Sequence, residues 1–494
     1  MKKRLLVTTL AVLGGCAHVA RNEVRTVRQP TFDGGGYPVE WCDTAYVGLA
    51  ARCTLVGSGP QLVLRANVIS NDRLYLGGSL IIDPDGRIGA VGCQVPRMPD
   101  ARVVDCPGAL ISAGLINLHE HIDYSHQQPP EPPALRWRHR NEWRRLSSAE
   151  RGFDDDAPDD ATVRTQVSER ALLRHALAGT TSISGAKDYR AFLRNLDLAK
   201  APLGSPTGIP VVASTFPLND GASMAILAAP CTAAEIGAIQ FEPSRPFIAH
   251  VGEGSNASAG YEIDCVLRAV AGKSTPNAFV HGIAIGAGQI PHLKRQGVAV
   301  VLSPRSNFQL YGVTAPVLAL KDAGVALGLG TDWSRSGSLT LLDEARCLSR
   351  YSRDRLQGRI RASDLHRMMT AGAASAVGLQ GQVGSLAPGE WADLVVFDTE
   401  GRLSLADVLE HSALPQTLAV LIGGRIASAP PYWAGHLPQL DNCSIDPRQL
   451  CGRARVVCGA DARRPLSTVL QPSPYSIDDT RLCQPQPTDD CVAR

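Results

Sequence analysis

Strand-like and helix-like segments alternate through the middle of this chain, and this alternation limits the fold more than any other feature of the sequence. Strand–helix alternation over such a length is typical of a parallel α/β fold. Seven apolar runs are interpreted as strands, at residues 115–118, 180–184, 210–214, 247–250, 279–281, 298–302 and 325–330. An eighth strand, which would close a (β/α)8 barrel of the TIM type, is expected between residues 185 and 245, where no run marks it.

Shorter strand patterns flank this region on both sides. Residues 62–105 contain alternating apolar runs and a hairpin turn at residues 83–86, and a strand pattern returns at residues 384–397. We therefore expect the barrel, residues 111–379, to be inserted in a small β-sandwich domain built from residues 61–110 and 380–436. A chain of 494 residues, 44% of them hydrophobic, is long enough for both.

Histidine or aspartate stands at the end of four of the predicted strands. His119 and His121 lie two residues apart after the first run, so they project to the same side, as two metal ligands would. A pair of this kind also occurs as simple polar termination of a strand. His250, His281 and Asp332 follow three later strands, however, and the carboxyl ends of parallel barrel strands meet on one face. Together these residues predict a site there.

Six motifs follow one another in order along the chain, at residues 114–121, 250–253, 280–282, 303–307, 330–333 and 384–393. They resemble the amidohydrolase superfamily, and in particular its branch that includes cytosine deaminase and the triazine hydrolases. The resemblance covers residues 62–424. It implies that His119, His121, His250 and Asp332 bind one divalent metal, Zn2+ or Fe2+.

Relatives with two metals bridge them with a carbamylated lysine on a middle strand. Lys200 is the only lysine between residues 188 and 250, and its surroundings predict a loop. Lys187 comes too early in the chain for that role. We therefore expect a site with one metal.

The resemblance and the chemistry of such sites also predict roles for further residues. Asp332 is expected to accept a proton from water, Glu253 to pass one to the leaving nitrogen, and His281 to orient the nucleophile or polarise the attacked carbon. The structural alternative for Glu253 is a carboxylate in the first turn of a helix, where the helix dipole favours a negative charge. Arg305 and Asn307 are predicted either to contact the substrate or to cap a loop.

These features predict a metal-dependent hydrolase that cleaves a non-peptide carbon–nitrogen bond of a small molecule, as a deaminase or a cyclic-amide hydrolase does. The alternatives are hydrolysis of another leaving group, such as chloride, and a catalytically silent surface-binding protein. A net charge of +2 gives no sign of a nucleic-acid partner. The sequence leaves open whether the protein forms a homo-oligomer. His126 and His139, in the long polar stretch 125–160, are expected to be exposed.

The amino terminus has the pattern of an export signal. A basic start is followed by the apolar run 5–13, which is too short to span a bilayer, and then by Cys16 in a lipobox-like context. We expect cleavage before Cys16 and its lipidation, with residues 17–60 as a tether and cysteine-containing segment. The alternative is an ordinary signal peptide. Ala17 after the cysteine favours the bacterial outer membrane, facing the periplasm or the cell surface.

Setting Cys16 aside, twelve of the thirteen cysteines remain, an even number that suits disulfides in an oxidising compartment. The proline-rich tail, residues 437–494, is expected to be held by disulfides within itself or to the β-domain. Cys93 and Cys106 are the best single predicted pair. The barrel cysteines are expected to be free, buried thiols: Cys231, Cys265 and Cys347.

Overall fold

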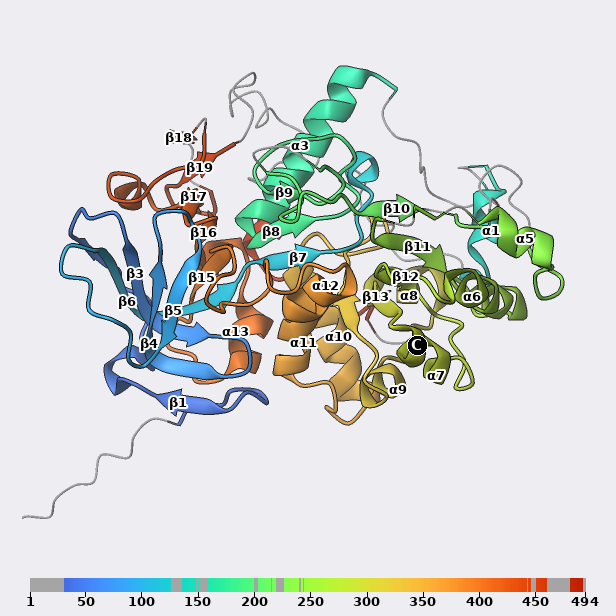
Figure 1. The fold of residues 1–494 in the computed structure, drawn as a ribbon, viewed down its shortest axis with the longest axis horizontal. Helices are drawn as coiled ribbons and strands as arrows, with labels where there is room; N and C mark the ends of the chain where they lie inside the picture. The colour runs from blue at the N-terminus through green and yellow to red at the C-terminus, as the bar shows by residue number, and fades with distance from the viewer. Residues whose placement is uncertain are drawn as a thin grey trace, which may run out of the picture.

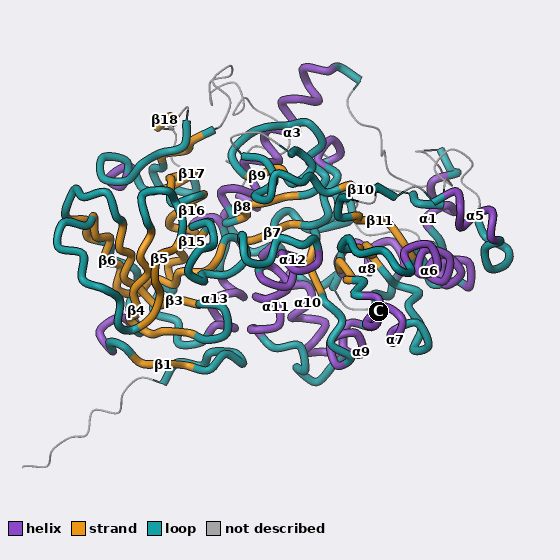
Figure 2. The backbone as a smooth tube through the Cα atoms, in the orientation of Figure 1, coloured by secondary structure: helices purple, strands orange, loops and turns teal. Residues whose placement is uncertain are grey.

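The computed structural model shows a large sheet on one side and a barrel surrounded by helices on the other (Figure 1). Figure 2 shows the same division, with most helices gathered around the barrel. The structure describes residues 31–125, 136–147, 150, 159–199, 203–214, 216–218, 226–239, 241–242, 244–441, 443–445, 450–459 and 480–491. Cys16, Lys200 and His126 lie outside these residues. No helix among them is long and apolar enough to cross a bilayer.

Strands from both flanks of the chain form one eleven-stranded sheet, in the order β1-β4-β3-β6-β15-β16-β17-β19-β18, with β2 on β6 and β5 on β4. Strand β6, from before the barrel, pairs antiparallel with β15, from after it, and Ala113 is opposite Leu394 in this pairing. This pairing joins the two flanks of the barrel in one sheet. The strands are β1 (Val39–Trp41), β2 (Thr54–Val56), β3 (Leu62–Ile69), β4 (Leu74–Ile82), β5 (Ile88–Gly92), β6 (Arg102–Ala113), β15 (Leu394–Asp398), β16 (Thr417–Ile422), β17 (Arg425–Ala429), β18 (Cys443–Ile445) and β19 (Val456–Cys458).

Eight parallel strands, β7 to β14, follow one another around the barrel in chain order. These strands form two sheets, β7-β8-β9 and β10-β11-β12-β13-β14. Two backbone hydrogen bonds join the edges of one sheet to those of the other. The amide of Val211 donates to the carbonyl of Leu196 at 2.8 Å, and the amide of Leu118 donates to the carbonyl of Leu329 at 3.2 Å. The predicted (β/α)8 barrel is thereby closed. The strands are β7 (Leu115–Asn117), β8 (Thr180–Ile183), β9 (Arg194–Asn195), β10 (Val212–Ser214), β11 (Phe247–Val251), β12 (Asn277–His281), β13 (Ala299–Leu302) and β14 (Leu327–Leu329).

The strand that the sequence did not mark is β9, which has only two residues, both polar. The carboxyl group of Asp393, which directly precedes β15 of the large sheet, accepts two hydrogen bonds from the Arg194 side chain, at 2.6 and 3.0 Å. This buried ion pair explains why a strand without an apolar run is accommodated in a barrel wall.

Helices cover the outside of the barrel, and several begin at a residue whose side chain caps free backbone amides. Asp160 caps α3 in this way, Asn256 caps α6 and Thr340 caps α10. The α-helices are α1 (Arg140–Arg144), α3 (Ala161–Leu177), α5 (Ala233–Ala238), α6 (Ala257–Val270), α7 (Ile290–Gln296), α8 (Pro304–Tyr311), α9 (Val317–Asp322), α10 (Leu341–Arg355), α11 (Ala362–Met369), α12 (Ala371–Ala376) and α13 (Leu405–His411). Short 3-10 helices are η1 (Thr44–Tyr46), η2 (Ile122–Tyr124), η3 (Leu414–Gln416), η4 (Pro431–Trp433) and η5 (Thr480–Cys483).

Alternate residues of the barrel strands join two separate apolar clusters. On β11, Phe247 and Ala249 belong to the cluster that includes the surrounding helices. Ile248, between them, belongs to an inner cluster with Val280 and Val301 of the next two strands. Since side chains two residues apart share a face, the next polar residue after Ile248 on the inner face is residue 250.

Six disulfides link the twelve cysteines. The predicted Cys93–Cys106 pair is wrong, because strand register places other partners beside these cysteines. Antiparallel pairing of β2 with β6 sets Thr54 opposite Asp105 and so brings Cys53 next to Cys106. Cys42 and Cys93 join because they follow β1 and β5, which both pair with β4.

The prediction of free thiols in the barrel is also wrong. Cys231 bonds to Cys265, and Cys347 bonds to Cys491, near the end of the tail. Two further disulfides lie within the tail and so agree with its expected role: Cys443–Cys458 and Cys451–Cys483.

Candidate metal centre

Three imidazoles meet at the carboxyl end of the barrel. The Nε2 atom of His119 lies 3.1 Å from the Nε2 atoms of both His121 and His250, and the latter two are 3.2 Å apart. A neutral imidazole has one N–H, so three facing nitrogens cannot all be satisfied by one another. Four ligands at 2.0–2.1 Å around a tetrahedral metal are separated by roughly 3.3–3.4 Å. The spacing therefore fits three ligands of one cation.

A carboxylate completes this cluster. The Oδ1 atom of Asp332 lies 3.4 Å from the Nε2 atoms of both His119 and His121. Its other oxygen accepts a hydrogen bond of 2.6 Å from the hydroxyl of Ser306. The Asp332 amide donates to the carbonyl of His119 at 2.9 Å, and the residue has a φ of 60°, so the backbone itself turns the side chain towards the histidines.

The electrostatic environment favours neutral histidines. Burial and the neighbouring imidazoles lower the pKa of His119 well below its usual value, and burial lowers the pKa of His121 to about 4. Both rings are therefore neutral at pH 7, which is the form that binds metals. Burial raises the pKa of Asp332 well above its usual value, and a bound cation acts in the opposite direction. The donor set of three neutral nitrogens and one carboxylate fits a divalent metal.

Beside this cluster lies a buried acid–base network. The phenol of Tyr311 donates to Oε1 of Glu253 at 2.6 Å, and the indole of Trp143 donates to the Tyr311 oxygen at 3.1 Å. The second oxygen of Glu253 lies 3.8 Å from Nε2 of His281. Since Nδ1 of His281 lies 2.8 Å from the side-chain oxygen of Asn307, Nδ1 holds the ring proton in the neutral form. The lone pair is then on Nε2, on the side of Glu253.

His281 reaches this position through an unusual backbone conformation. Strand alternation alone would send residue 281 to the opposite face from Val280, which belongs to the inner cluster. His281 has a φ of 68°, and this left-handed turn breaks the alternation at the strand end. Its imidazole centroid lies 5.0 Å from that of His119.

The two residues predicted to contact substrate or to cap a loop, Arg305 and Asn307, both have hydrogen-bond partners within the protein. The Arg305 guanidinium donates to Ser338 Oγ at 2.9 Å and to Asp490 Oδ1 at 2.6 Å, so it is engaged away from the four clustered residues. Asn307 bonds to His281 and acts through that ring. Ser306 lies in the motif 303–307 but no role was predicted for it, and Tyr311 was not singled out at all; both belong to the helix that follows the predicted strand 298–302.

The prediction that His139 is exposed is wrong. Its Nε2 atom lies 3.0 Å from Oε1 of Glu262, which is buried on α6 and whose other oxygen accepts a bond of 2.7 Å from Arg140. A buried carboxylate needs such partners. The interaction fixes α1 beside the metal centre, where Trp143 stacks on Trp333 at a centroid distance of 6.0 Å. The basic and aromatic run 137–145 was the one signal of this in the sequence.

Lys187 is engaged elsewhere. Its ammonium group forms an ion pair with Asp123, and its side chain is 59% exposed. It therefore takes no part in the cluster of histidines.

Comparison with known proteins agrees with this geometry. The amidohydrolase family model matches residues 110–427, which is more than half of the chain. The chain belongs to the amidohydrolase family. It is 33% identical over 153 residues to a 5-methylthioadenosine/S-adenosylhomocysteine deaminase from Teredinibacter turnerae, covering 30% of this chain and 34% of that protein. It is 38% identical over 128 residues to a deaminase of the same name from Pelotomaculum thermopropionicum, covering 25% and 29%. The chain thus matches about a third of the length of these curated relatives.

Solved structures of this amidohydrolase's neighbours share its fold over much greater lengths. An adenosine deaminase from Xanthomonas campestris with bound zinc superimposes with a TM-score of 0.59 at 19% identity, covering 77% of this chain and 94% of that one. An atrazine chlorohydrolase from Arthrobacter aurescens complexed with zinc gives a TM-score of 0.54 at 18% identity, covering 74% and 95%. These likenesses confirm the barrel fold.

Proposed function

We propose that this amidohydrolase is a metal-dependent enzyme that hydrolyses a non-peptide carbon–nitrogen bond of a small molecule, as a deaminase or a cyclic-amide hydrolase. The observation that carries the proposal is the convergence of three imidazole nitrogens within 3.1–3.2 Å, beside the Glu253–His281 pair. The names of the curated relatives, which are deaminases, support the same class of reaction.

We assign His119, His121, His250 and Asp332 as the ligands of one divalent cation, Zn2+ or Fe2+. Imidazole and carboxylate donors suit both metals. Zinc is favoured by the bound zinc of the two structural neighbours. When bound, such a metal supplies a Lewis-acidic centre that makes water a nucleophile near neutral pH.

The residues of the chain supply the proton transfers. Asp332 is positioned by Ser306 and accepts a proton from the attacking water. Glu253 takes up the other proton of the attacking water and passes it to the leaving nitrogen, so that the bond to carbon breaks with release of ammonia or an amine. Tyr311 donates a hydrogen bond to one carboxylate oxygen of Glu253, and the other oxygen is on the side of His281. His281, held by Asn307, orients the reacting group.

The test is turnover by purified protein that has been loaded with zinc or with Fe2+. A panel of aminopurines, amidines and lactams is assayed for ammonia release and ring opening, and chlorinated heterocycles are assayed for chloride release. We expect release of nitrogen from at least one compound. Release of chloride alone would assign a different leaving group, and metal-loaded protein that binds these compounds without turnover would show a binding protein.

We also propose that the protein is exported and attached to a membrane by a lipid on Cys16. The proposal rests on the basic start, the short apolar run and the cysteine that follows it. Six disulfides among the remaining cysteines suit an oxidising compartment and support export.

A further inference from the structure

One short helix, α8, contacts three of the groups to which the proposed function assigns chemistry. Ser306 donates to Asp332 at 2.6 Å, and Asn307 lies 2.8 Å from the His281 ring nitrogen. Tyr311, at the end of the same helix, donates to Glu253 at 2.6 Å. A displacement of α8 would therefore disturb all three contacts together.

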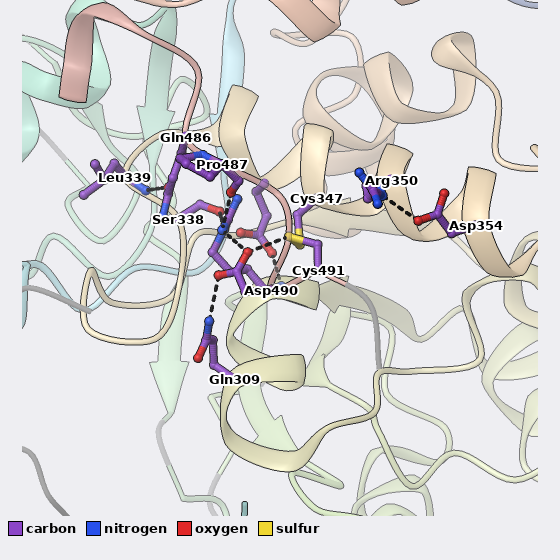
Figure 3. The surroundings of a disulfide bond; sticks show 12 residues. Gln309, Ser338, Leu339, Cys347, Arg350, Asp354, Gln486, Pro487, Asp490 and Cys491 are labelled. Atoms are coloured by element: carbon purple, nitrogen blue, oxygen red, sulfur yellow. Dashed lines mark hydrogen bonds and ion pairs between the residues drawn. A yellow bond between two sulfur atoms is a disulfide. The ribbon is translucent and has the colours of Figure 1, made fainter. Parts of the chain in front are cut away.

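Another set of side chains on α8 is bound by the carboxyl-terminal segment of the chain. The carboxylate of Asp490 accepts from the Arg305 guanidinium at 2.6 Å and from the Gln309 amide at 2.7 Å, one bond to each oxygen. Figure 3 shows Asp490 between Gln309 and the disulfide that follows it. Residues four apart on a helix, such as Arg305 and Gln309, are neighbours on its surface. Asp490 therefore binds one side of α8 at two points.

Arg305 depends on this contact, because its side chain is only 2% exposed. Its guanidinium also donates to the carbonyl of Pro487 at 2.9 Å, so a second group of the same segment binds it. Glu344 accepts from the backbone amide of Arg305 rather than from its guanidinium. Within the described residues, Asp490 is thus the carboxylate in direct contact with the buried charge. A buried cation without its partner is strongly destabilising.

The segment itself is fastened to the barrel on both sides of Pro487. Cys491 bonds to Cys347 of α10 across 144 residues of sequence, and both cysteines are fully buried. Upstream, the side-chain oxygen of Gln486 accepts from the backbone amide of Leu339 at 3.1 Å (Figure 3). The backbone amide of Gln486 donates to the Asp343 carboxylate at 2.9 Å. Asp490 is therefore held in a defined position rather than being a mobile charge on a loose tail.

We infer that Asp490 is a positioning residue of the active site. It acts through Arg305 and Gln309 to hold α8 in the position in which this helix contacts the residues of the metal centre. The inference rests on the proposed function. Misplacement of catalytic groups by about 1 Å can cost about 100-fold in rate. The carboxyl-terminal segment thus contributes to the geometry of the site, although Asp490 contacts none of the predicted metal ligands itself.

The test compares Asp490→Ala with Asp489→Ala in the full chain. Asp489 is the adjacent, exposed carboxylate, so its loss removes the same charge without the contacts to α8. Two experiments are carried out well below the melting temperature: the visible absorption spectrum of the Co2+-substituted protein is recorded, and steady-state kinetics give KM and the kcat per bound metal. We expect Asp490→Ala to change the cobalt spectrum and to lower kcat by about 10- to 100-fold. KM should change less than kcat, and Asp489→Ala should match the wild type.

The inference is overturned if Asp490→Ala and Asp489→Ala give the same cobalt spectrum and the same kcat per metal, even where Asp490→Ala melts earlier. That result would make the segment a clamp for stability alone. If Asp490→Ala does not fold, Asp490→Asn, which keeps the shape and removes the charge, is judged by the same two readouts. If the wild type turns over nothing, the proposed function fails, and the cobalt spectra still decide the role of Asp490.

Discussion

The phenol of Tyr311 donates a hydrogen bond of 2.6 Å to the buried carboxylate of Glu253. Burial, with the charge of Glu253 beside it, raises the pKa of Tyr311 well above its usual value. The phenol consequently stays protonated and remains a donor across the whole range of pH in which such an enzyme would be assayed. This bond fixes the orientation of the residue to which we assign proton delivery.

Tyr311→Phe should lower kcat by roughly 10-fold or more, because a hydrogen bond to a charged group contributes about 1.5–3 kcal/mol. Metal content should be unchanged. Steady-state kinetics and elemental analysis check both effects. An unchanged kcat would separate Tyr311 from the function of Glu253.

Glu253→Gln should retain its metal and lose most of its activity, since the four predicted ligands are intact and only proton transfer is removed. The expected loss is about 100- to 10,000-fold. Elemental analysis alongside kinetics measures both properties, with the exposed Glu242→Gln as the matched control. A metal-free Glu253→Gln protein would instead make Glu253 a ligand or a residue that orients one.

The protein should bind one divalent metal per chain, and His250→Ala should bind far less. A chelator should abolish activity and lower the melting temperature, because metal binding stabilises only the folded state. Lys187→Ala should leave the stoichiometry unchanged, since this lysine pairs with Asp123. Two tightly bound metals per chain, counted by elemental analysis, would contradict the expected single-metal site.

Stability should fall in acid partly through His366. Burial lowers the pKa of its ring from 6.5 to about 3, and its two nitrogens lie 2.9 Å from the Tyr37 hydroxyl and 2.7 Å from the Ser112 hydroxyl. Between these pKa values the unfolded chain binds the proton that the folded protein excludes. The contribution is therefore complete above pH 6.5 and is lost as pH falls towards 3, at up to about 1.4 kcal/mol per pH unit.

The measurement is urea unfolding at several pH values with disulfides intact. His366→Gln should show a shallower loss of unfolding free energy between pH 6 and pH 4 than the wild type. The exposed His411→Gln serves as the control and should follow the wild type. Parallel curves for all three proteins would mean that His366 is not the group responsible.

Cys16→Ser should release the protein from the membrane fraction of a bacterial host, because the proposed lipid is then missing and no helix among the described residues could span a bilayer. Fractionation and immunoblotting of the wild type and the variant make the comparison. Persistent membrane association of Cys16→Ser would require another means of attachment.

Sequence reasoning could predict that His119, His121, His250 and Asp332 lie close together, because each is next to an apolar strand and strand ends are readable from the hydrophobic pattern. It could not place β9, whose two polar residues are stabilised by an ion pair with a residue almost two hundred positions away. Such a pair leaves no local signal.

The same limit explains the other errors. His139 was predicted to be exposed because its surroundings are polar, yet its ring is fully buried and bonds to Glu262 of the distant helix α6. Cys93 and Cys106 were expected to pair because they flank one turn at the ends of two short strands, whereas strand register pairs Cys106 with Cys53. Local pattern therefore predicts which elements form, and long-range pairing decides what their ends contact.

The pairing of β6 with β15 has a consequence for how the chain can fold. As the protein is synthesised, β6 is complete by residue 113, but the strand that covers its edge begins only at residue 394. Throughout that interval the edge offers unpaired backbone groups to other chains. The whole barrel has to be made, and brought back to its starting point, before the edge is closed. Contacts this distant in sequence slow folding, so we expect assembly of the sheet to be a late event and the unfinished chain to be prone to aggregation.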